Sequence, residues 1–456
     1  MKAEIIAVGS ELLTPDRTDT NSLFLTGQLN RLGIVVTRKT VVGDRNDDVK
    51  DAFRGALGRV ELVIASGGLG PTQDDLTREA VAELLGRKLV RNDAVMKHIE
   101  ERFRRLGRSM AEVNRRQAMV PEGAEVLENT HGTAPGLWLE ERGRVVVLLP
   151  GVPRELMALF SEQVAPRLGR FAGATRLFYR ELRTAGMTES EVEQRIAPIY
   201  TAYAGVETTI LASLGEIQIH LRAWSEDAAG TERMLQEMVE RITLALGEGL
   251  FTTNGETLEE VVARDLTMNQ ASVATAESCT GGLLAQRLTR TPGSSVYFLG
   301  GVVCYSNNLK TGWADVPASV LESKGAVSAE VARALAEGIR RRTGATLGIG
   351  ITGIAGPGGG TPEKPVGLVH IALAAAAGCS ERVTRFPGNR EQIRWFASQM
   401  ALDMIRQFFL HGGVLHGGVL HGGVPHGGQA AERRDAIKAT GRSKSANRRD
   451  VDSGGR

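Results

Sequence analysis

Short β-branched runs that alternate with helical patterns are the feature that most constrains the fold of this 456-residue chain. Near the N-terminus the runs are "AEIIAVG", "IVVTRKTVVG", "ELVIASGG" and "RVVVLLPG", with amphipathic stretches between them. This alternation is typical of α/β domains, in which helices join largely parallel strands. Residues 1–171 are therefore predicted to form one α/β domain.

The pattern changes twice after that domain, as expected for a chain too long for a single core. Residues 172–253 are predicted to form a strand, a helix, a strand and a helix, with polar alternation in the second strand, "EIQIHLRAW", which indicates a small α+β module with one solvated sheet face. Residues 254–410 return to the α/β pattern and end in a long amphipathic helix. Residues 411–456 hold a histidine and glycine repeat and a basic end, which predict a disordered tail, with weak nickel or zinc binding as the alternative.

Composition excludes several classes of protein. Three widely spaced cysteines favour a reducing cytoplasm over a disulfide framework or a zinc site. The longest nearly apolar run, residues 367–379, is shorter than the roughly 20 residues that cross a bilayer, and the start of the chain lacks the pattern of a secretion signal. With a formal net charge of +2, the chain is not predicted to bind nucleic acid specifically. We expect a cytoplasmic protein without a membrane segment.

The turn "AESCTGG" carries the strongest chemical signal of the third domain. A strand is predicted to end at Glu277 and a helix to begin near Gly281, so Ser278 would lie beside free backbone amides that can hold an oxyanion or a phosphate. A serine nucleophile needs a base. Lys310 is the candidate, since burial lowers the pKa of a lysine, and Tyr305 is close enough in sequence to share the pocket. The alternative is that the serine only caps the helix.

Two further loops of this domain favour a phosphorylated substrate. "GIGITGIAGPGGG" holds more glycines than packing requires, so its backbone turns sharply or approaches a ligand. In "RFPGNREQ", Asn389 and Arg390 are predicted at a helix start, where amides and a guanidinium can clamp an anion. A phosphorylated substrate with a carbonyl group to attack would fit these loops.

The segment "SGGLGPTQDDLT" of the first domain also joins a buried strand to a helix. Its glycines expose backbone amides, and its two aspartates can hold a metal that bridges phosphates. An ordinary preference for acidic residues at a helix start is the alternative. The candidate nucleotide or metal contacts are Gly67, Gly68, Gly70, Thr72, Asp74 and Asp75.

In combination these segments resemble the CinA family. The third domain is similar to the CinA C-terminal domain in "ATAESCTGG", "GSSVYFLGGVVCYSNNLK", "GAVSAEVA", "GITGIAGPGGG", "KPVGLVHIAL" and "FPGNR". The resemblance implies a three-layer α/β domain that hydrolyses nicotinamide mononucleotide (NMN) to nicotinate mononucleotide and ammonia without a cofactor. It makes Ser278 the nucleophile, Lys310 the base and Tyr305 its helper. The substrate contacts that it implies are Thr280, Gly281, Gly282, Thr352, Gly353 and Arg390, the last at the phosphate.

The first domain is similar to the molybdopterin-binding fold, through Asp44 in "VVGD", "GTAPG" at 132–136 and "LPGVP" at 149–153. In CinA proteins this fold is associated with metal-dependent hydrolysis of ADP-ribose, which makes Asp44 and Asp75 the expected ligands of a divalent metal such as Mg²⁺. The segment "LLTPDRTDTN" departs from the family pattern, although Asn21 is retained, so the nucleotide specificity stays open. The middle module resembles the KH-like linker of the family.

As a whole, the resemblance implies a homodimer that hydrolyses NMN and ADP-ribose in pyridine nucleotide recycling. Two alternatives stay open. One is a non-catalytic nucleotide-binding or adaptor protein linked to competence and DNA repair, and the other is binding of a molybdopterin-like ligand by the first domain. The set of Ser278, Tyr305 and Lys310 favours catalysis, because a binding module does not require both a nucleophile and a base.

Overall fold

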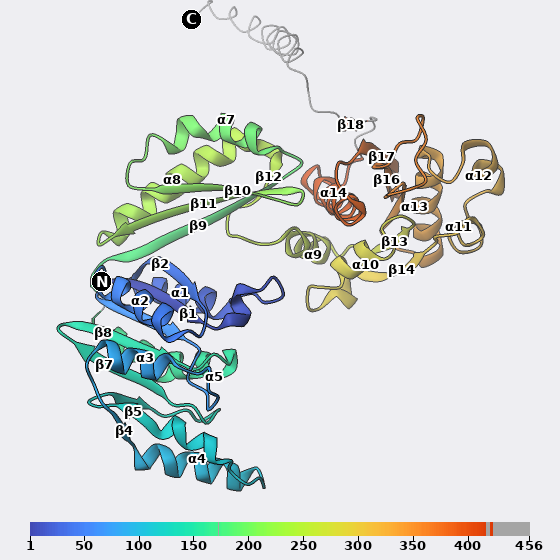
Figure 1. Ribbon diagram of the computed structural model, residues 1–456. Helices are drawn as coiled ribbons and strands as arrows, with labels where there is room; N and C mark the ends of the chain where they lie inside the picture. Colours follow the sequence, from blue (N-terminus) through green and yellow to red (C-terminus); the bar gives the residue numbers. More distant parts are fainter. Residues whose placement is uncertain (172, 416–419, 423–456) are drawn as a thin grey trace, which may run out of the picture. The chain divides into compact units, whose positions relative to one another are not determined.

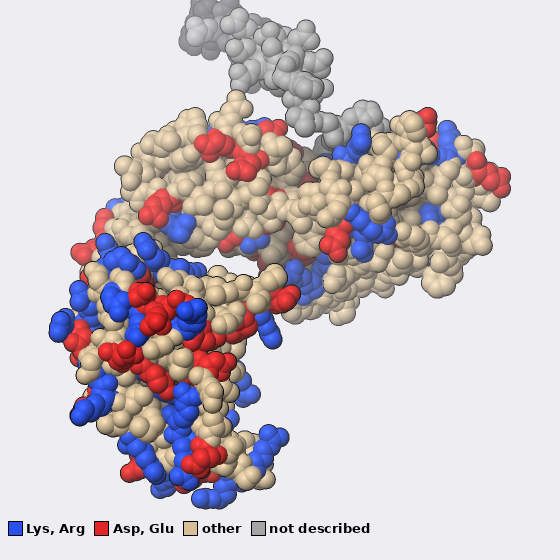
Figure 2. All heavy atoms as spheres, in the orientation of Figure 1, with Lys and Arg blue, Asp and Glu red and all other residues tan. Residues whose placement is uncertain are grey.

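The computed structural model describes residues 1–171, 173–415 and 420–422 as an α/β chain with four sheets (Figure 1). Contacts group the chain into two compact units, and the residues of the middle module are shared between them. None of the helices in these residues has the length and apolar character needed to cross a bilayer. On the face drawn in Figure 2, acidic and basic side chains are interspersed over the N-terminal domain, so this face carries no charge field of one sign.

The N-terminal sheet has the strand order β2-β1-β3-β8-β7-β6. Its first four strands are parallel and the last two pair antiparallel. The central carboxyl ends therefore meet at one edge, where α/β proteins place their ligands. The strands are β1 (Lys2–Val8), β2 (Val35–Val42), β3 (Leu62–Ser66), β6 (Glu125–Leu127), β7 (Gly136–Glu141) and β8 (Arg144–Leu149), and a separate ribbon pairs β4 (Leu89–Arg91) with β5 (Met119–Pro121).

Helices cover both faces of this sheet, which explains why its central strands are apolar along their whole length. Ile5 of β1 packs in one core with Leu25 of α1, whereas the next residue, Ile6, packs in the opposite core with Phe53 of α2. Successive side chains of a strand point to opposite faces, so both residues are buried. The helical segments are η1 (Ser10–Leu13), α1 (Thr20–Arg31), α2 (Asn46–Leu57), α3 (Thr77–Leu84), α4 (Asp93–Arg105), η2 (Glu112–Ala118), α5 (Pro153–Leu159), η3 (Phe160–Val164) and α6 (Ala165–Leu168).

The middle module has a four-stranded sheet in the order β10-β11-β9-β12 and two helices. The sequence pattern predicted strand, helix, strand and helix, so it missed the short β12 and also β10. That strand, "ETTILAS", lies at the sheet edge with half-buried or exposed side chains, so it lacks the alternation that marks a strand with one buried face. The elements are β9 (Arg176–Ala185), α7 (Glu189–Tyr200), β10 (Glu207–Ser213), β11 (Glu216–Ser225), α8 (Ala228–Leu246), η4 (Gly247–Gly249) and β12 (Leu250–Thr252).

The C-terminal domain has three layers, with a sheet in the order β14-β13-β15-β16-β17-β18 between two layers of helices. The first three strands are parallel, β16 and β17 are antiparallel, and β18 pairs with the outer edge of β17. Helices α9 and α14 pack on one face, and α13 packs on the other. The strands are β13 (Val273–Glu277), β14 (Phe298–Val303), β15 (Leu347–Gly353), β16 (Leu368–Ala375), β17 (Gly378–Arg385) and β18 (Leu420–Gly422). The helical segments are α9 (Leu258–Met268), α10 (Leu283–Leu288), η5 (Ser294–Val296), α11 (Asn307–Ala314), α12 (Ala318–Lys324), α13 (Ala329–Thr343) and α14 (Arg390–Leu410).

Glycines in β15 allow α13 to pack directly on the strand backbone. A methyl group added at Gly350 would lie 2.2 Å from the carbonyl oxygen of Ala332 in α13, and one added at Gly348 would lie 2.1 Å from that of Ala336. Both contacts are with backbone atoms, so the helix itself would have to move. The position of α13 is thus set by the absence of side chains at Gly348 and Gly350, where it packs on β15.

We predict that Gly350→Ala destabilises the C-terminal domain by about 1–3 kcal/mol, the usual cost of overpacking a core. The matched control is Gly312→Ala in α11, where an added methyl group meets nothing within 4 Å. Because alanine favours a helix over glycine, this control should stabilise the domain by up to about 1 kcal/mol. Differential scanning calorimetry of the whole chain would measure both shifts, and an equal effect of the two substitutions would contradict the packing argument.

Candidate functional site

The serine turn, residues 278–282, lies where three parallel strands end. It follows β13, which has β14 on one side and β15 on the other. The amide of Ser278 donates to the carbonyl of Ile351 in β15 at 3.0 Å. The carbonyl of Glu277 accepts from the amide of Cys304, just after β14, at 2.8 Å. Ser278 is therefore fixed between the ends of both neighbouring strands.

The carboxylate of Glu277 anchors the helix that follows this turn. Its Oε2 accepts the N–H groups of Gly282 and Leu284 at 3.0 and 3.1 Å, and its Oε1 accepts that of Ala285 at 2.8 Å. These amides belong to the start of α10, where a helix has no carbonyl partners of its own. Through these contacts Glu277 anchors the turn.

Two amides of the serine turn, those of Cys279 and Thr280, have no hydrogen-bond partner among the described residues. The amide of Gly281 donates to the carbonyl of Ser278 at 3.1 Å, and that of Gly282 donates to the glutamate. Both glycines have left-handed backbone conformations, with φ of 61° and 91°, which other residues adopt with strain. The glycines thus shape the turn, and the two amides before them are the ones left to bind an oxyanion.

Ser278 is 8% exposed, and its hydroxyl group makes no hydrogen bond within the described part of the chain. Burial raises the pKa of the neighbouring Cys279 thiol to about 12, so this thiol stays protonated at neutral pH and acts as a packing group. Between the two neighbouring side chains, the serine is the available nucleophile.

Lys310 is 1% exposed, and its Nζ donates to the carbonyl oxygens of Cys304 and Tyr305, both at 3.0 Å. Desolvation by burial lowers the pKa of Lys310. A neutral amine has two hydrogens and one lone pair, so two carbonyl partners use both hydrogens and leave the lone pair to accept a proton. An ammonium group would bury a third N–H, for which the described residues offer no partner. These contacts favour the form that a base requires.

The hydroxyl of Tyr305 contacts Arg390. The Nη2 of Arg390 donates to the Oη of Tyr305 at 3.0 Å, and its Nη1 donates to the carbonyl of Gly356 in the glycine-rich loop at 2.9 Å. Lys310 donates to the backbone carbonyl oxygen of Tyr305, and Tyr305 is 56% exposed. Asn389 caps α14, since its side chain accepts the amide of Gln392. The structure therefore brings the predicted phosphate contact to the tyrosine.

The two predicted threonine contacts are buried. Thr352 donates its hydroxyl to the carbonyl of Ala326 at 2.7 Å. Thr280 is 0% exposed, and its hydroxyl lacks a hydrogen-bond partner among the described groups. Gly353, at the end of β15, is partly exposed. Thr352 therefore supports the loop that precedes α13, and a substrate would have to displace that contact to reach its hydroxyl.

The N-terminal candidate residues surround a cavity of about 630 Å³ at the carboxyl ends of β1, β3 and β8. Six of the seven predicted contacts line it, and Thr72 does not. Thr72 donates its amide, at 2.9 Å, and its hydroxyl to Oδ2 of Asp75, so it holds that carboxylate in place. The predicted residues on the cavity wall are Asp44, Gly67, Gly68, Gly70, Asp74 and Asp75.

The buried side chain of Arg78 sets the orientation of the GGLG loop, residues 67–70. Its Nη1 donates to the carbonyl of Leu69 at 2.8 Å and its Nη2 to that of Gly70 at 3.3 Å. The amide of Gly67 is bonded to a strand carbonyl, whereas those of the three residues after it have no partner in the described chain. Consecutive free amides form a concave site for an anion. Sequence analysis missed Arg78, which looks like an ordinary residue of α3.

The carboxylates of this cavity suit a hard cation. Asp44 accepts the amide of Ser10 through one oxygen, and Asp75 uses Oδ2 for Thr72, so each keeps an oxygen for a metal. Mg²⁺ usually takes one or two carboxylates and completes its shell with water and phosphate oxygens. No group of three or more histidine, cysteine or acidic side chains able to hold a metal occurs in the described residues. The donor set therefore fits a metal that arrives with a phosphorylated ligand.

Other polar residues that line the cavity were not among the predicted contacts. Glu11 and Arg17 follow β1, and Glu155 lies in the first turn of α5, after β8. Asn21 also lines the cavity and donates to the carbonyl of Gly151 at 2.8 Å. The available signal was their position, because each follows the end of a parallel strand.

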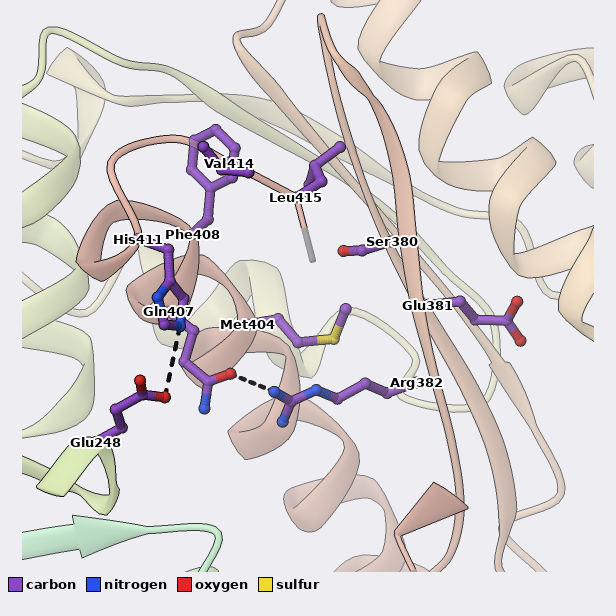
Figure 3. Close-up of a pocket in the computed structure, with 10 residues that line it drawn as sticks. All are labelled: Glu248, Ser380, Glu381, Arg382, Met404, Gln407, Phe408, His411, Val414 and Leu415. Carbon is purple, nitrogen blue, oxygen red and sulfur yellow. Dashed lines mark hydrogen bonds and ion pairs between the residues drawn. The ribbon is translucent and has the colours of Figure 1, made fainter. Parts of the chain in front are cut away.

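A separate cavity of about 310 Å³ lies near the end of α14 (Figure 3). One side is apolar, with Phe408 and Leu415, and the carboxylate of Glu381 points away from it. The Nε2 atom of His411, the first histidine of the repeat, lies 3.5 Å from Oε2 of Glu248. Of the predicted tail, residues 411–415 and 420–422 are described, the latter as β18, and the disorder prediction for the other residues lies outside the described part of the chain. None of the predicted catalytic residues lines this cavity.

The fold and these sites define a multidomain α/β protein with two strand-end sites, one lined by free loop amides and carboxylates and the other built on a serine turn. Residues 255–409 match the CinA C-terminal domain, residues 4–170 the probable molybdopterin binding domain, and residues 179–252 the damage-inducible protein CinA KH domain. The two α/β domains are consistent with an enzyme of the hydrolase type. The chain belongs to the CinA family.

Two relatives that match most of the chain support this assignment, and one solved structure is similar to a part of it. A CinA-like protein of Koribacter versatilis is 48% identical over 411 residues, which are 89% of this chain and 99% of the relative. A putative competence-damage inducible protein of Acetivibrio thermocellus is 42% identical over 410 residues, 90% and 99% of the two chains. The crystal structure of a CinA protein of unknown function from Thermoplasma acidophilum is 36% identical over 36% of this chain and 96% of its own, with a TM-score of 0.35.

If the serine turn hydrolyses NMN, as we propose below, kcat/KM should rise with pH through a pKa below 10.5, the ordinary value for lysine, and level off above it. The rate rises with pH because only the neutral amine of Lys310 can accept the serine proton. At lower pH this amine is protonated and cannot act as a base. Lys310→Arg should be inactive across the range, since a guanidinium stays protonated. Lys324→Arg, at an exposed position of α12, should keep the wild-type pH profile, and a profile that falls as pH rises through this range would exclude Lys310 as the base.

Proposed function

We propose that the serine turn hydrolyses the carboxamide of NMN, giving nicotinate mononucleotide and ammonia. The observation that carries this proposal is the environment of Lys310, whose two carbonyl partners leave its lone pair free. One of these carbonyls belongs to Cys304, whose amide is bonded to the residue before Ser278. Ser278 thus follows β13, and the Nζ of its candidate base, Lys310 of α11, reaches the end of the adjacent β14.

In the first step, Ser278 Oγ bonds to the carboxamide carbon while its proton passes to Lys310 Nζ. The carbonyl π electrons move to oxygen, and the resulting oxyanion would be held by the amides of Cys279 and Thr280. When the carbonyl re-forms, the C–N bond breaks, and nitrogen takes the proton from Lys310 to leave as ammonia. Water then attacks the acyl ester with Lys310 again as base, which releases nicotinate mononucleotide and restores the serine. These steps require no cofactor.

Arg390 is the residue proposed to bind the substrate phosphate. Its two hydrogen-bond partners, the Tyr305 hydroxyl and the Gly356 carbonyl, are both neutral. Within the described residues no carboxylate forms an ion pair with it, so its charge is uncompensated and available to a phosphate dianion. Phosphate binding at Arg390 would place the substrate beside the tyrosine, which we propose as the helper of Lys310.

We predict ammonia release from NMN by the purified chain without added metal, measured by a coupled glutamate dehydrogenase assay. Ser278→Ala and Lys310→Ala should each lower kcat by several orders of magnitude, roughly 10⁴-fold or more, as for other nucleophiles and bases. The matched control is Ser272→Ala, which removes a partly exposed serine just before β13. Binding of NMN without turnover by the native chain would replace the amidase proposal with a nucleotide sensor or adaptor.

For the N-terminal cavity, we propose metal-dependent hydrolysis of ADP-ribose to AMP and ribose 5-phosphate. The supporting observation is that three consecutive free amides, at residues 68–70, line the same cavity as Asp44 and Asp75. The amides would bind a phosphate of the pyrophosphate, and the carboxylates would hold a divalent metal such as Mg²⁺. When bound, the metal would neutralise charge on the pyrophosphate. Binding of a molybdopterin-like ligand without chemistry is the alternative for this cavity.

We predict that Asp44→Asn and Asp75→Asn each reduce Mg²⁺-dependent AMP release by at least roughly a hundredfold, the upper range for groups that only support a metal ligand. Asparagine keeps an oxygen that can accept the hydrogen bonds from Thr72, so loss at position 75 would reflect charge. Asp93→Asn, on the exposed start of α4, is the control. AMP release measured by chromatography that persists in EDTA, or in both variants, would exclude the metal-dependent mechanism.

The proposal as a whole describes a homodimeric cytoplasmic enzyme of pyridine nucleotide recycling, with NMN and ADP-ribose as its small-molecule partners. The two sites belong to different domains with separate sheets, so each activity should survive loss of the other. Analytical ultracentrifugation of the whole chain would test the homodimer, which should give a single species with twice the mass of one chain.

A further inference from the structure

The side chain of Arg394 contacts the serine turn from α14. Its Nε and Nη2 both donate to the carbonyl oxygen of Thr280, at 3.1 and 2.8 Å. Arg394 lies one helical turn after Arg390, the residue proposed for the substrate phosphate. Neither the sequence pattern nor the proposed mechanism gave Arg394 a role.

This contact fixes one peptide unit of the turn from both sides. The carbonyl of Thr280 and the N–H of Gly281 belong to the same planar group and point in opposite directions. The carbonyl is held by Arg394, and the N–H donates to the carbonyl of Ser278 at 3.1 Å. The orientation of this peptide unit therefore affects the backbone position of Ser278 and of the free amides of Cys279 and Thr280.

The opposite side of the turn is held by Glu277, whose carboxylate binds the amides at the start of α10. An anion thus holds N–H groups and a cation holds a carbonyl, with the serine turn between them. We propose that Arg394 is a positioning residue that orients Ser278 and the amides of Cys279 and Thr280 for attack on the substrate. This inference rests on the proposed amidase function.

The test compares Arg394→Ala and Arg394→Lys with the native chain, and Arg290→Ala serves as the control because Arg290 is exposed in the same domain. We expect kcat for NMN to fall about ten- to a hundredfold in both variants, as for a misplaced reacting group. KM and the pH profile should change little, since Arg394 touches neither the proposed phosphate contact nor Lys310. Lysine can supply only one of the two hydrogen bonds, and added guanidinium ion should restore part of kcat to Arg394→Ala.

A second readout separates this inference from the amidase proposal. A fluorophosphonate forms a bond from phosphorus to Ser278 Oγ and loses fluoride, while the serine proton passes to the base, so its labelling rate reports the nucleophile and oxyanion donors without NMN. We expect labelling, followed by mass spectrometry, to slow in both Arg394 variants and to be unchanged in Arg290→Ala. Labelling of the native chain without ammonia release would disprove the amidase function only. A labelling rate in Arg394→Ala equal to the native rate, or no labelling of the native Ser278, would overturn the positioning role.

Discussion

The carboxylate of Glu277 is the interaction on which the geometry of the C-terminal site depends. A buried carboxylate without partners is strongly disfavoured, and its donors here are the amides at the start of α10. The chain reaches them by reversing direction within a few residues, which requires left-handed conformations at Gly281 and Gly282. The bend at Ser278 is thus a consequence of where a buried charge finds its hydrogen bonds.

The GGLG loop of the N-terminal domain is also held by a buried charged side chain, but this side chain is a cation, Arg78. Arg78 binds carbonyl groups of the GGLG loop, so the amides stay free, whereas Glu277 consumes amides and leaves few. An arginine behind the loop therefore makes a broad anion site, and a glutamate behind the turn makes a narrow one. This difference fits the two proposed ligands, a pyrophosphate in one domain and a single carbonyl oxygen in the other.

The order of the elements and the location of both sites at strand ends could be predicted from the sequence, because periodicity and turn residues are local signals. The hydrogen-bond partners of individual atoms could not be predicted from it. Arg78 and Arg394 look like ordinary helix residues, and only the fold shows that each binds a loop carbonyl. Thr352 looks like a substrate contact, but its hydroxyl is bonded to Ala326, 26 residues away. Long-range pairing is set by packing, which one sequence does not display.

The pairing of β18 with β17 bears on the solubility of the protein. In the described sheet β17 has β16 on one side, and its other side is covered over Arg382–Thr384 by β18. An uncovered strand edge offers free N–H and C=O groups to any other extended chain and promotes aggregation. A shortened chain that ends with α14 would expose this edge over Arg382–Thr384, so β18 covers backbone groups through which a second molecule could pair.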